Sequence, residues 1–137
     1  MFNRYNTLIT TIGAIVSAAA SFLWGAKDTW IMALVTFMVA DYISGVAAAY
    51  INKEISSLKG FKGILKKLLM MLPVAVGHML DKTVGTDGAL RGAAIGFLMA
   101  NEGISVLENC ARAGVPIPKV LLNTLVQVKN DSDLEDR

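Results

Sequence analysis

Residues 30–51 read WIMALVTFMVADYISGVAAAYI, and Asp41 is the one charged side chain among these 22 residues. An apolar run of about 20 residues is long enough to cross the hydrocarbon core of a bilayer as a helix. A charged carboxylate at the centre of such a helix costs roughly 2.5–3.5 kcal/mol on insertion scales, so it usually faces a bundle interior, an association interface or water. The stretch therefore predicts a membrane protein whose helices assemble around polar groups.

The apolar residues of the chain are clustered in segments of similar length. Of its 137 residues, 54% are hydrophobic, and most of these lie within residues 8–24, 30–51, 64–80 and 89–107. None of these segments has the long polar face that a helix of a small soluble domain needs. We therefore expect an all-α membrane protein with three to four transmembrane helices, four being favoured, in a single domain over residues 1–128. The mixed-charge tail, residues 129–137, has no apolar period, which predicts disorder.

Two of the four segments leave alternatives open. Arg4, the apolar residues from Leu8 and the small residues 18–20 resemble a signal peptide with its cleavage site, but small residues continue beyond that point, which favours an uncleaved first helix. In the third segment, the uninterrupted apolar part rises only about 20 Å, against a hydrocarbon core of roughly 30 Å. It crosses the bilayer if Lys66 and Lys67 extend back to the surface; otherwise it is re-entrant or lies on the surface.

Lysines follow the second segment on a stretch with helical periodicity. Five lysines stand against one acid, Glu54, and they are Lys53, Lys59, Lys62, Lys66 and Lys67. Apolar residues recur there at spacings of three and four, so residues 55–66 fit a basic amphipathic helix on an anionic membrane surface; a plain charged loop is the alternative. With four crossings, ten of the thirteen Lys and Arg lie on the side of both termini, which predicts cytoplasmic termini. A second short amphipathic helix is expected over residues 118–128.

Small residues recur at every fourth position on three of the segments, and such rows let membrane helices approach closely. The predicted helix-packing residues are Gly13, Ser17, Ser21, Gly25, Gly45, Gly92, Gly96 and Ala100. On the last segment, Arg91, Glu102 and Asn109 share the face opposite the glycines, and this face either packs among neighbouring helices or lines a water-filled lumen. The predicted intramembrane polar residues are Asp41, Arg91, Asn101, Glu102 and Asn109.

The sequence lacks the residues of a catalytic or metal site. It contains one histidine, His78, and one cysteine, Cys110, with no HExxH motif, phosphate-binding loop or cysteine pair. A zinc site therefore lacks ligands, and the lysines flank membrane segments instead of forming a nucleic-acid-binding pattern. We expect no enzyme activity, no cofactor and no nucleic-acid partner.

The order of several short motifs resembles one known family. Asp41-Tyr-Ile-Ser-Gly45 ends one span, and Lys59-Gly-Phe-Lys-Gly63 with Lys66-Lys67 follows it. The later motifs are His78-Met-Leu-Asp81, Asn101-Glu-Gly-Ile-Ser105, Leu107-Glu-Asn109 and Gly114-Val-Pro-Ile-Pro118. Over residues 30–128, this ordered set is similar to the phage lysis holins that are grouped with the clostridial toxin-secretion holins.

The resemblance implies a non-catalytic protein of the bacterial cytoplasmic membrane. Holins of this type accumulate in that membrane and then oligomerise into lesions, which release a peptidoglycan hydrolase (endolysin) or, in toxin-secreting relatives, a toxin. The implied partners are copies of the same chain and a bilayer with anionic headgroups. The alternatives are a small ion or drug transporter, which also needs intramembrane carboxylates, and an antagonist or accessory subunit of a holin.

Depth in the membrane suggests a role for Asp41. Its nearest polar neighbours in depth are Asn101 and Glu102, whereas Arg91 lies near the outer end of its helix and is better placed to pair with Asp81. Two carboxyl groups at similar depth in a low dielectric favour protonation of at least one of them. We therefore expect a neutral, hydrogen-bonded Asp41 in the closed assembly, which ionises once water enters.

Overall fold

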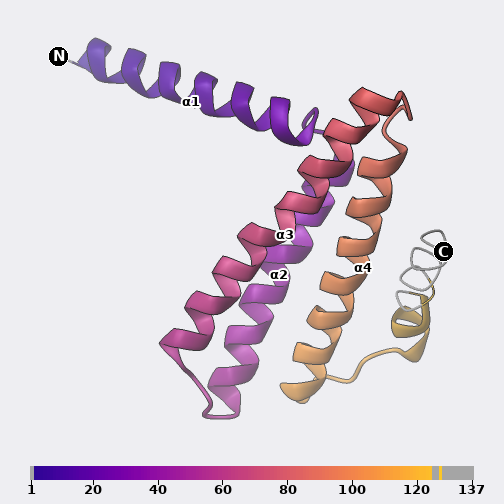
Figure 1. The fold of residues 1–137 in the computed structure, drawn as a ribbon. Coiled ribbons are helices and arrows are strands. Elements are labelled where there is room, and N and C mark those ends of the chain that lie inside the picture. Colours follow the sequence, from indigo (N-terminus) through magenta and orange to yellow (C-terminus); the bar gives the residue numbers. More distant parts are fainter. Residues whose placement is uncertain (1, 125–126, 128–137) are drawn as a thin grey trace.

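Four long helices make up the part of the chain that the structure describes (Figure 1). The computed structural model describes residues 2–124 and 127, and the side chains of residues 4–124 and 127. The helices are α1, Phe2–Trp24; α2, Thr29–Ile51; α3, Ser57–Val84; and α4, Ala89–Arg112. The described residues are all-helical and include no strand, as the sequence predicts.

Polar side chains and a glycine set the helix ends. Asp28 caps the N-terminus of α2 by accepting a hydrogen bond from the Ile31 amide at 3.0 Å, and Ser56 caps α3 through the Lys59 amide at 3.4 Å. Both caps satisfy amides that have no partner inside the helix. Gly85 ends α3 in the left-handed conformation, with a φ of 81°, which glycine adopts without strain.

The bundle is formed by α2, α3 and α4, with α4 as its central helix. α4 contacts both α2 and α3 extensively, whereas α2 and α3 contact each other much less. The buried core consists of Leu34 and Met38 of α2, Val74 of α3, and Ile95 and Leu98 of α4. Since Leu34 and Ile95 lie in the first halves of their helices, this core fills mainly the end of the bundle where α1 joins.

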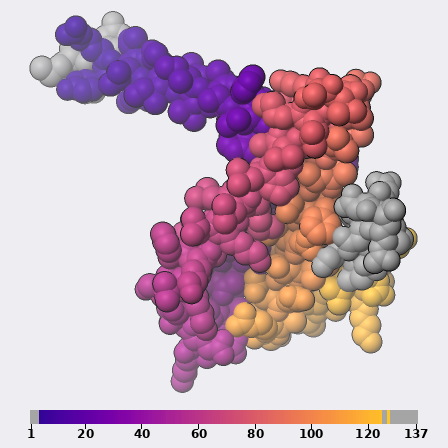
Figure 2. All heavy atoms as spheres, in the orientation of Figure 1, coloured from indigo at the N-terminus to yellow at the C-terminus, as the bar shows by residue number. Residues whose placement is uncertain are grey.

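α1 projects away from this bundle (Figures 1 and 2). None of its described side chains is buried, and apolar residues such as Ile9, Ile15 and Phe22 are each more than 60% exposed. Only its last turn docks, where Trp24 Nε1 donates a hydrogen bond to the Met71 carbonyl at 2.8 Å. A helix that is apolar on all sides and has no protein neighbour fits a lipid surrounding.

Among the described residues, three helices are long and apolar enough to cross a membrane, namely Arg4–Trp24, Thr29–Ile51 and Ser57–Val84. α4 is not among them, because it carries Arg91, Asn101, Glu102 and Glu108. With 24 residues, it still rises about 36 Å. The fourth crossing therefore stays a prediction.

α3 is a single helix where the sequence predicts two elements. The expected surface helix, residues 55–66, and the expected span, residues 64–80, run together without a break, and the helix continues through Pro73. The separation into two elements is therefore wrong, because Ser56 caps the helix at its basic end and no later residue stops it. Its 28 residues rise about 42 Å, which is about 12 Å more than a hydrocarbon core of roughly 30 Å. The first turns, with Lys59 and Lys62, can therefore extend beyond the core.

The second predicted surface helix, residues 118–128, is described only in part. The backbone is helical at residues 119–124 and at residue 127. The remainder of that prediction, and the predicted disordered tail at residues 129–137, lie outside the described residues.

Candidate functional site: a polar network inside the bundle

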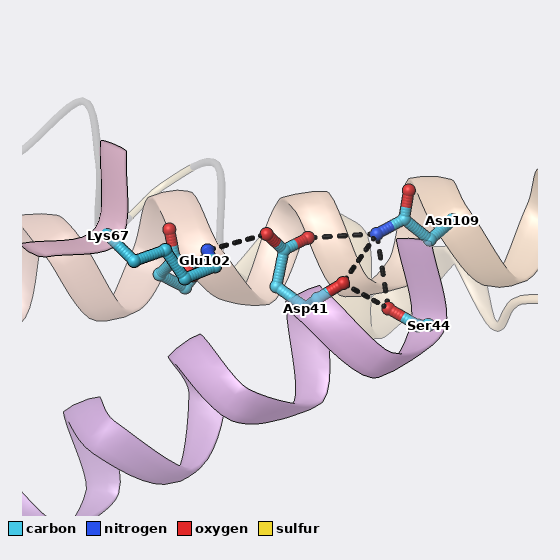
Figure 3. A network of polar contacts seen from close by, with 5 residues as sticks. All are labelled: Asp41, Ser44, Lys67, Glu102 and Asn109. Carbon is cyan, nitrogen blue, oxygen red and sulfur yellow. Dashed lines mark hydrogen bonds and ion pairs between the residues drawn. The ribbon is translucent and has the colours of Figure 1, made fainter. Parts of the chain in front are cut away.

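A network of ion pairs joins α2, α3 and α4 inside the bundle (Figure 3). Lys67 of α3 reaches between the carboxylates of Asp41 on α2 and Glu102 on α4. Its Nζ lies 2.7 Å from Asp41 Oδ2 and also pairs with Glu102. The side chains of Lys67, Asp41 and Glu102 are 16%, 18% and 5% exposed. One lysine therefore holds two acids and connects all three helices.

Asn109 of α4 completes the network on the other side of Asp41 (Figure 3). Its Nδ2 donates to Asp41 Oδ1 at 2.8 Å and to Ser44 Oγ at 3.1 Å. Gly45 faces this amide, since a β-carbon at Gly45 would lie 3.4 Å from Asn109 Nδ2. Asp41, Ser44 and Gly45 share one face of α2, because residues three and four apart are neighbours on a helix. Both carboxylate oxygens of Asp41 are thus bonded, one from α3 and one from α4.

The network carries two carboxylates and one ammonium group. Charges in an interior are tolerated where opposite charges and hydrogen bonds surround them. Removing one partner of a buried pair costs about 3–5 kcal/mol, because it leaves an uncompensated charge. Movement of Lys67 away from the bundle would therefore leave both acids uncompensated, which penalises separation of α3 from α2 and α4.

Three of the five predicted intramembrane polar residues, Asp41, Glu102 and Asn109, meet in this network. Their face of α4 packs among neighbouring helices, which is one of the two arrangements that the sequence left open. Asn101 is half-buried outside the network. Arg91 belongs to a second cluster, nearer the N-terminal end of α4.

Lys67 does not lie with the other lysines. Lys53, Lys59, Lys62 and Lys66 are exposed, as expected of a membrane-surface group, whereas Lys67 points inward. Consecutive residues of a helix point about 100° apart because one turn takes 3.6 residues. Lys66 and Lys67 therefore face different surroundings although they are adjacent in sequence.

The structure adds a partner to Asp41 that the sequence analysis did not foresee. The sequence pattern placed two carboxyl groups at similar depth and supplied no cation between them. Lys67 places an ammonium group 2.7 Å from Asp41 Oδ2, which is a partner that the sequence pattern did not identify. The neutral Asp41 and its ionisation on entry of water stay predictions.

Arg91 forms the second polar cluster, at the end of the bundle where α1 joins. Its Nη1 lies 2.7 Å from Asp28 Oδ2, and its Nε donates to the Trp24 carbonyl at 2.6 Å. The side chain of Arg91 is only 12% exposed. Asp28 is therefore the ion-pair partner of Arg91, and the expected pairing of Arg91 with Asp81 through their side chains is wrong. The cluster ties the α1–α2 turn to the start of α4.

Asp81 of α3 serves instead as a cap for α4. It is 6% exposed and accepts hydrogen bonds from the amides of Leu90 at 3.0 Å and Arg91 at 2.8 Å, and from the Thr86 hydroxyl. The residue at the N-cap of α4, Gly88, has no side chain that could cap the helix. Asp81 therefore supplies the acceptor that the free amides and the dipole of a helix N-terminus favour.

The pKa of Asp28 lies below its ordinary value, because Arg91 donates hydrogen bonds to its carboxylate and the Ile31 amide adds another. A lowered pKa in the folded state means that the interaction stabilises the fold fully at neutral pH and is lost as the pH falls through that folded-state pKa. The Asp28 side chain is 39% exposed, so solvent screening keeps this contribution small.

Asp28→Asn should therefore lower the thermal unfolding midpoint at neutral pH. The difference from the unaltered protein should shrink as the pH falls below roughly 4 and vanish below the lowered pKa of Asp28. Asparagine caps a helix about as well as aspartate, so the change isolates the ion pair with Arg91. Asp87→Asn, which neutralises an exposed acid at the same end, serves as the control. A difference that stays constant from neutral to acid pH would contradict the assignment.

The predicted small-residue rows divide between packed and open positions. Gly45 and Ala100 pack inside the bundle, and Gly25 lies in the turn after α1 with a φ of +82°. The open positions are Gly13, Gly92 and Gly96, where no described atom lies within 4 Å of an added β-carbon, and the exposed Ser17 and Ser21. Contacts between copies of the chain at these open positions stay a prediction.

Gly77 is a close-packing residue that the spacing of small residues did not identify. A β-carbon at Gly77 would lie 2.9 Å from the Leu90 carbonyl oxygen and 3.0 Å from the Arg91 amide nitrogen. The backbones of α3 and α4 therefore touch at this point. A single glycine inside an apolar helix, where alanine is more favourable, is the signal that could have identified it.

A cavity of about 380 Å³ opens between α2, α3 and α4 beside the network. Asp41, Lys67 and Glu102 line its inner end, and Glu54 and Ser56 line it where α2 connects to α3. In Figure 2 the surface is hollowed between α3, in magenta, and α4, in orange. The cavity offers water a path from that end of the bundle to the ion pairs.

Comparison with known proteins shows the family to which the sequence of this chain is similar. A sequence model of the bacteriophage holin family matches residues 18–130, which include all of α2, α3 and α4. The chain belongs to the bacteriophage holin family. The polar network and the cavity both lie within the matched residues, so they are features of a holin-family membrane protein.

Similar proteins cover most of the chain. The uncharacterized protein Lin0175 of Listeria innocua is 40% identical over 138 residues, spanning 93% of this chain and 99% of its own length. An uncharacterized 14.9 kDa protein of Clostridium perfringens is 40% identical over 119 residues, spanning 85% and 90%. A protein of Bacillus phage phi105 named probable holin is 33% identical over 115 residues, spanning 84% of each chain. No solved structure matches. Family membership and the three candidate spans among the described residues together point to a membrane protein.

Proposed function

We propose that this protein is a holin, which accumulates in the bacterial cytoplasmic membrane and then assembles into lesions that release a peptidoglycan hydrolase or an exported toxin. The supporting observation is the network of Asp41, Lys67, Glu102 and Asn109 inside the bundle of a holin-family chain. Polar and charged residues within membrane helices usually pair with one another or line a water-filled path. The same groups are paired in the closed chain and would line water in an open assembly.

The proposed topology has four crossings and cytoplasmic termini. The α1–α2 and α3–α4 turns lie at one end of the bundle, and the α2–α3 connection lies at the other (Figure 1). With four crossings, ten of the thirteen Lys and Arg belong to the segments assigned to the side of that connection, which favours the cytoplasm for this side. The charges of α4 at Arg91 and Glu102 point into the bundle, so α4 can cross without exposing them to lipid.

In the proposed lesion, α3 separates from α2 at the lysine-bearing end. At the other end, Gly77 and Asp81 hold α3 against α4, so that half is expected to stay in place. Pro73 lies between Lys67 and Gly77, and a proline removes one hydrogen bond from a helix interior and favours bending there. Movement of α3 about this point takes Lys67 from Asp41 and Glu102, and water from the cavity then hydrates both acids.

Induced expression in a bacterial host that holds a wall hydrolase in its cytoplasm tests the function. A holin predicts abrupt lysis that depends on the hydrolase, with release of a cytoplasmic reporter protein at the same moment. Slow growth arrest with ion leakage and no reporter release would favour a transporter. Delayed lysis by a co-expressed authentic holin would instead favour an antagonist.

Gly92→Leu combined with Gly96→Leu should delay or abolish lysis while membrane insertion stays normal. Both positions are open in the single chain, so the added side chains disturb contacts between copies, which small residues favour. Optical density after induction measures the lysis time, and membrane fractionation measures insertion. Lysis on an unchanged schedule would exclude these glycines from the contact between copies.

A further inference from the structure

The cavity between α2, α3 and α4 has positive charge without an acidic partner near its mouth. Three acids line the cavity, and each is paired: Asp41 and Glu102 with Lys67, and Glu54 with Arg112 at 3.0 Å. These pairs leave two further lining lysines, Lys59 and Lys66. Neither lysine forms an ion pair within the described range, residues 2–124 and 127. The cavity therefore offers two ammonium groups to an anion.

Two glycines that face Tyr42 lie between these two lysines in the sequence. Lys59 and Lys66 share one face of α3, because seven residues make nearly two full turns. Gly60 and Gly63 lie between them, and β-carbons there would lie 3.5 Å from the Tyr42 hydroxyl oxygen and 3.9 Å from the Tyr42 ring. This stretch of α3 therefore presents bare backbone toward α2, and the Tyr42 hydroxyl adds a hydrogen-bond donor to the two ammonium groups.

The remaining walls of the cavity suit a lipid better than a small soluble anion. Val46 and Ala49 of α2 and Ile55 of the α2–α3 connection line it beside the polar groups. Basic pockets between transmembrane helices on the cytoplasmic side bind the headgroups of anionic lipids. The proposed topology places this end of the bundle at the cytoplasmic surface, where such headgroups lie.

We propose that this cavity binds the phosphate headgroup of one anionic phospholipid through Lys59, Lys66 and the Tyr42 hydroxyl, with the acyl chains along α2 and α3. The inference rests on the proposed topology and is independent of lesion formation. A lipid in this position fills the space between α2 and α3 beside Lys67. It therefore favours the closed arrangement, and its loss favours separation of α3.

Two charge-matched double variants test the site. Lys59→Gln with Lys66→Gln removes the lysines of the cavity, and Lys53→Gln with Lys62→Gln removes two exposed lysines outside its lining. Each protein is placed in phosphatidylcholine nanodiscs with a minor share of phosphatidylglycerol, and native mass spectrometry counts the phosphatidylglycerol that stays bound. We expect about 25-fold weaker retention in the cavity variant, since each lysine beside an anionic headgroup contributes roughly fivefold. The other variant should change less than about twofold, because salt screens distant exposed charges.

Two further measurements separate the possible ligands. Gly63→Leu fills the cavity without changing the charge and should also reduce retention, with circular dichroism confirming the helical fold of every variant. Equal losses in both double variants would mean general surface attraction and would overturn the site. Displacement of the lipid by millimolar inorganic phosphate would assign the site to free phosphate and would overturn the proposal that its ligand is a phospholipid. The readout of this experiment is bound lipid and not lysis. If the chain binds the lipid but causes no lysis, the holin proposal is refuted and the lipid site still stands.

Discussion

Lys67→Met should lower the thermal unfolding midpoint in detergent by about 10 °C. The change removes the cation between Asp41 and Glu102 and leaves two carboxylates facing each other across α2 and α4. Removal of one partner from a buried pair costs about 3–5 kcal/mol. The lower end of that range applies here, because the Lys67 and Asp41 side chains are still 16% and 18% exposed and are therefore only partly buried. Methionine keeps the length and the apolar contacts of lysine, so the loss reports the charge.

Two further variants separate this charge effect from other causes. Lys66→Met makes the same change at the neighbouring, exposed lysine and should alter stability by no more than about 0.5 kcal/mol. Adding Asp41→Asn and Glu102→Gln to Lys67→Met removes the uncompensated acids and should recover most of the loss, because neutral replacement of a whole buried ion network is well tolerated. Equal midpoints for Lys67→Met and Lys66→Met would show that the network does not stabilise the bundle.

Gly77→Leu should prevent α3 from packing on α4 and produce the second large effect. The β-carbon alone would meet the Leu90 carbonyl oxygen at 2.9 Å, and backbone atoms of a packed helix cannot move aside cheaply. Overpacking of this kind typically costs about 1–3 kcal/mol and occasionally more. The same shift would displace Asp81 from the amides that it caps at the start of α4. The readout is the unfolding midpoint of purified protein, together with its yield in membranes.

Gly77→Ala and Gly96→Ala form the matched comparison for that effect. Alanine stabilises a helix interior by roughly 0.5–1 kcal/mol relative to glycine, and no described atom lies within 4 Å of a β-carbon at Gly96. Gly96→Ala should therefore keep or raise the midpoint, whereas Gly77→Ala should lower it. If both alanine variants were equally stable, α3 and α4 would not be in backbone contact at this position.

The helices themselves could be predicted because their signals are local. Apolar runs that are long enough to span a bilayer predicted α1, α2 and the membrane part of α3. The spacing of the polar residues along α4 predicted that Glu102 and Asn109 share one face of that helix. The extent of α3 could not be predicted in the same way. Its first turns carry lysines and read as a separate surface element, yet a cap at Ser56 is sufficient to start one continuous helix there.

The partners in the site depend on how the helices are rotated against each other. The sequence placed Asp41 and Glu102 at similar depth, but the orientation of α3 decides which of two adjacent lysines meets them. That orientation is fixed by packing far from the lysines, at Val74 and Gly77. Arg91 likewise pairs with Asp28 because the α1–α2 turn folds over the start of α4, which no spacing within one helix reveals.

A reducible bridge between α2 and α3 tests most directly whether lesions require these helices to separate. Tyr42→Cys and Gly63→Cys in a Cys110→Ser chain place two thiols at positions where the Tyr42 ring and a β-carbon at residue 63 are 3.9 Å apart. A bifunctional thiol reagent with a disulfide spacer joins them in lipid vesicles that contain a folded reporter protein, and each single-thiol variant is the control for the reagent. We predict that the bridged protein releases no reporter and that a reductant restores release. Release at the same rate before and after cleavage of the bridge would contradict the proposed separation of α3 from α2.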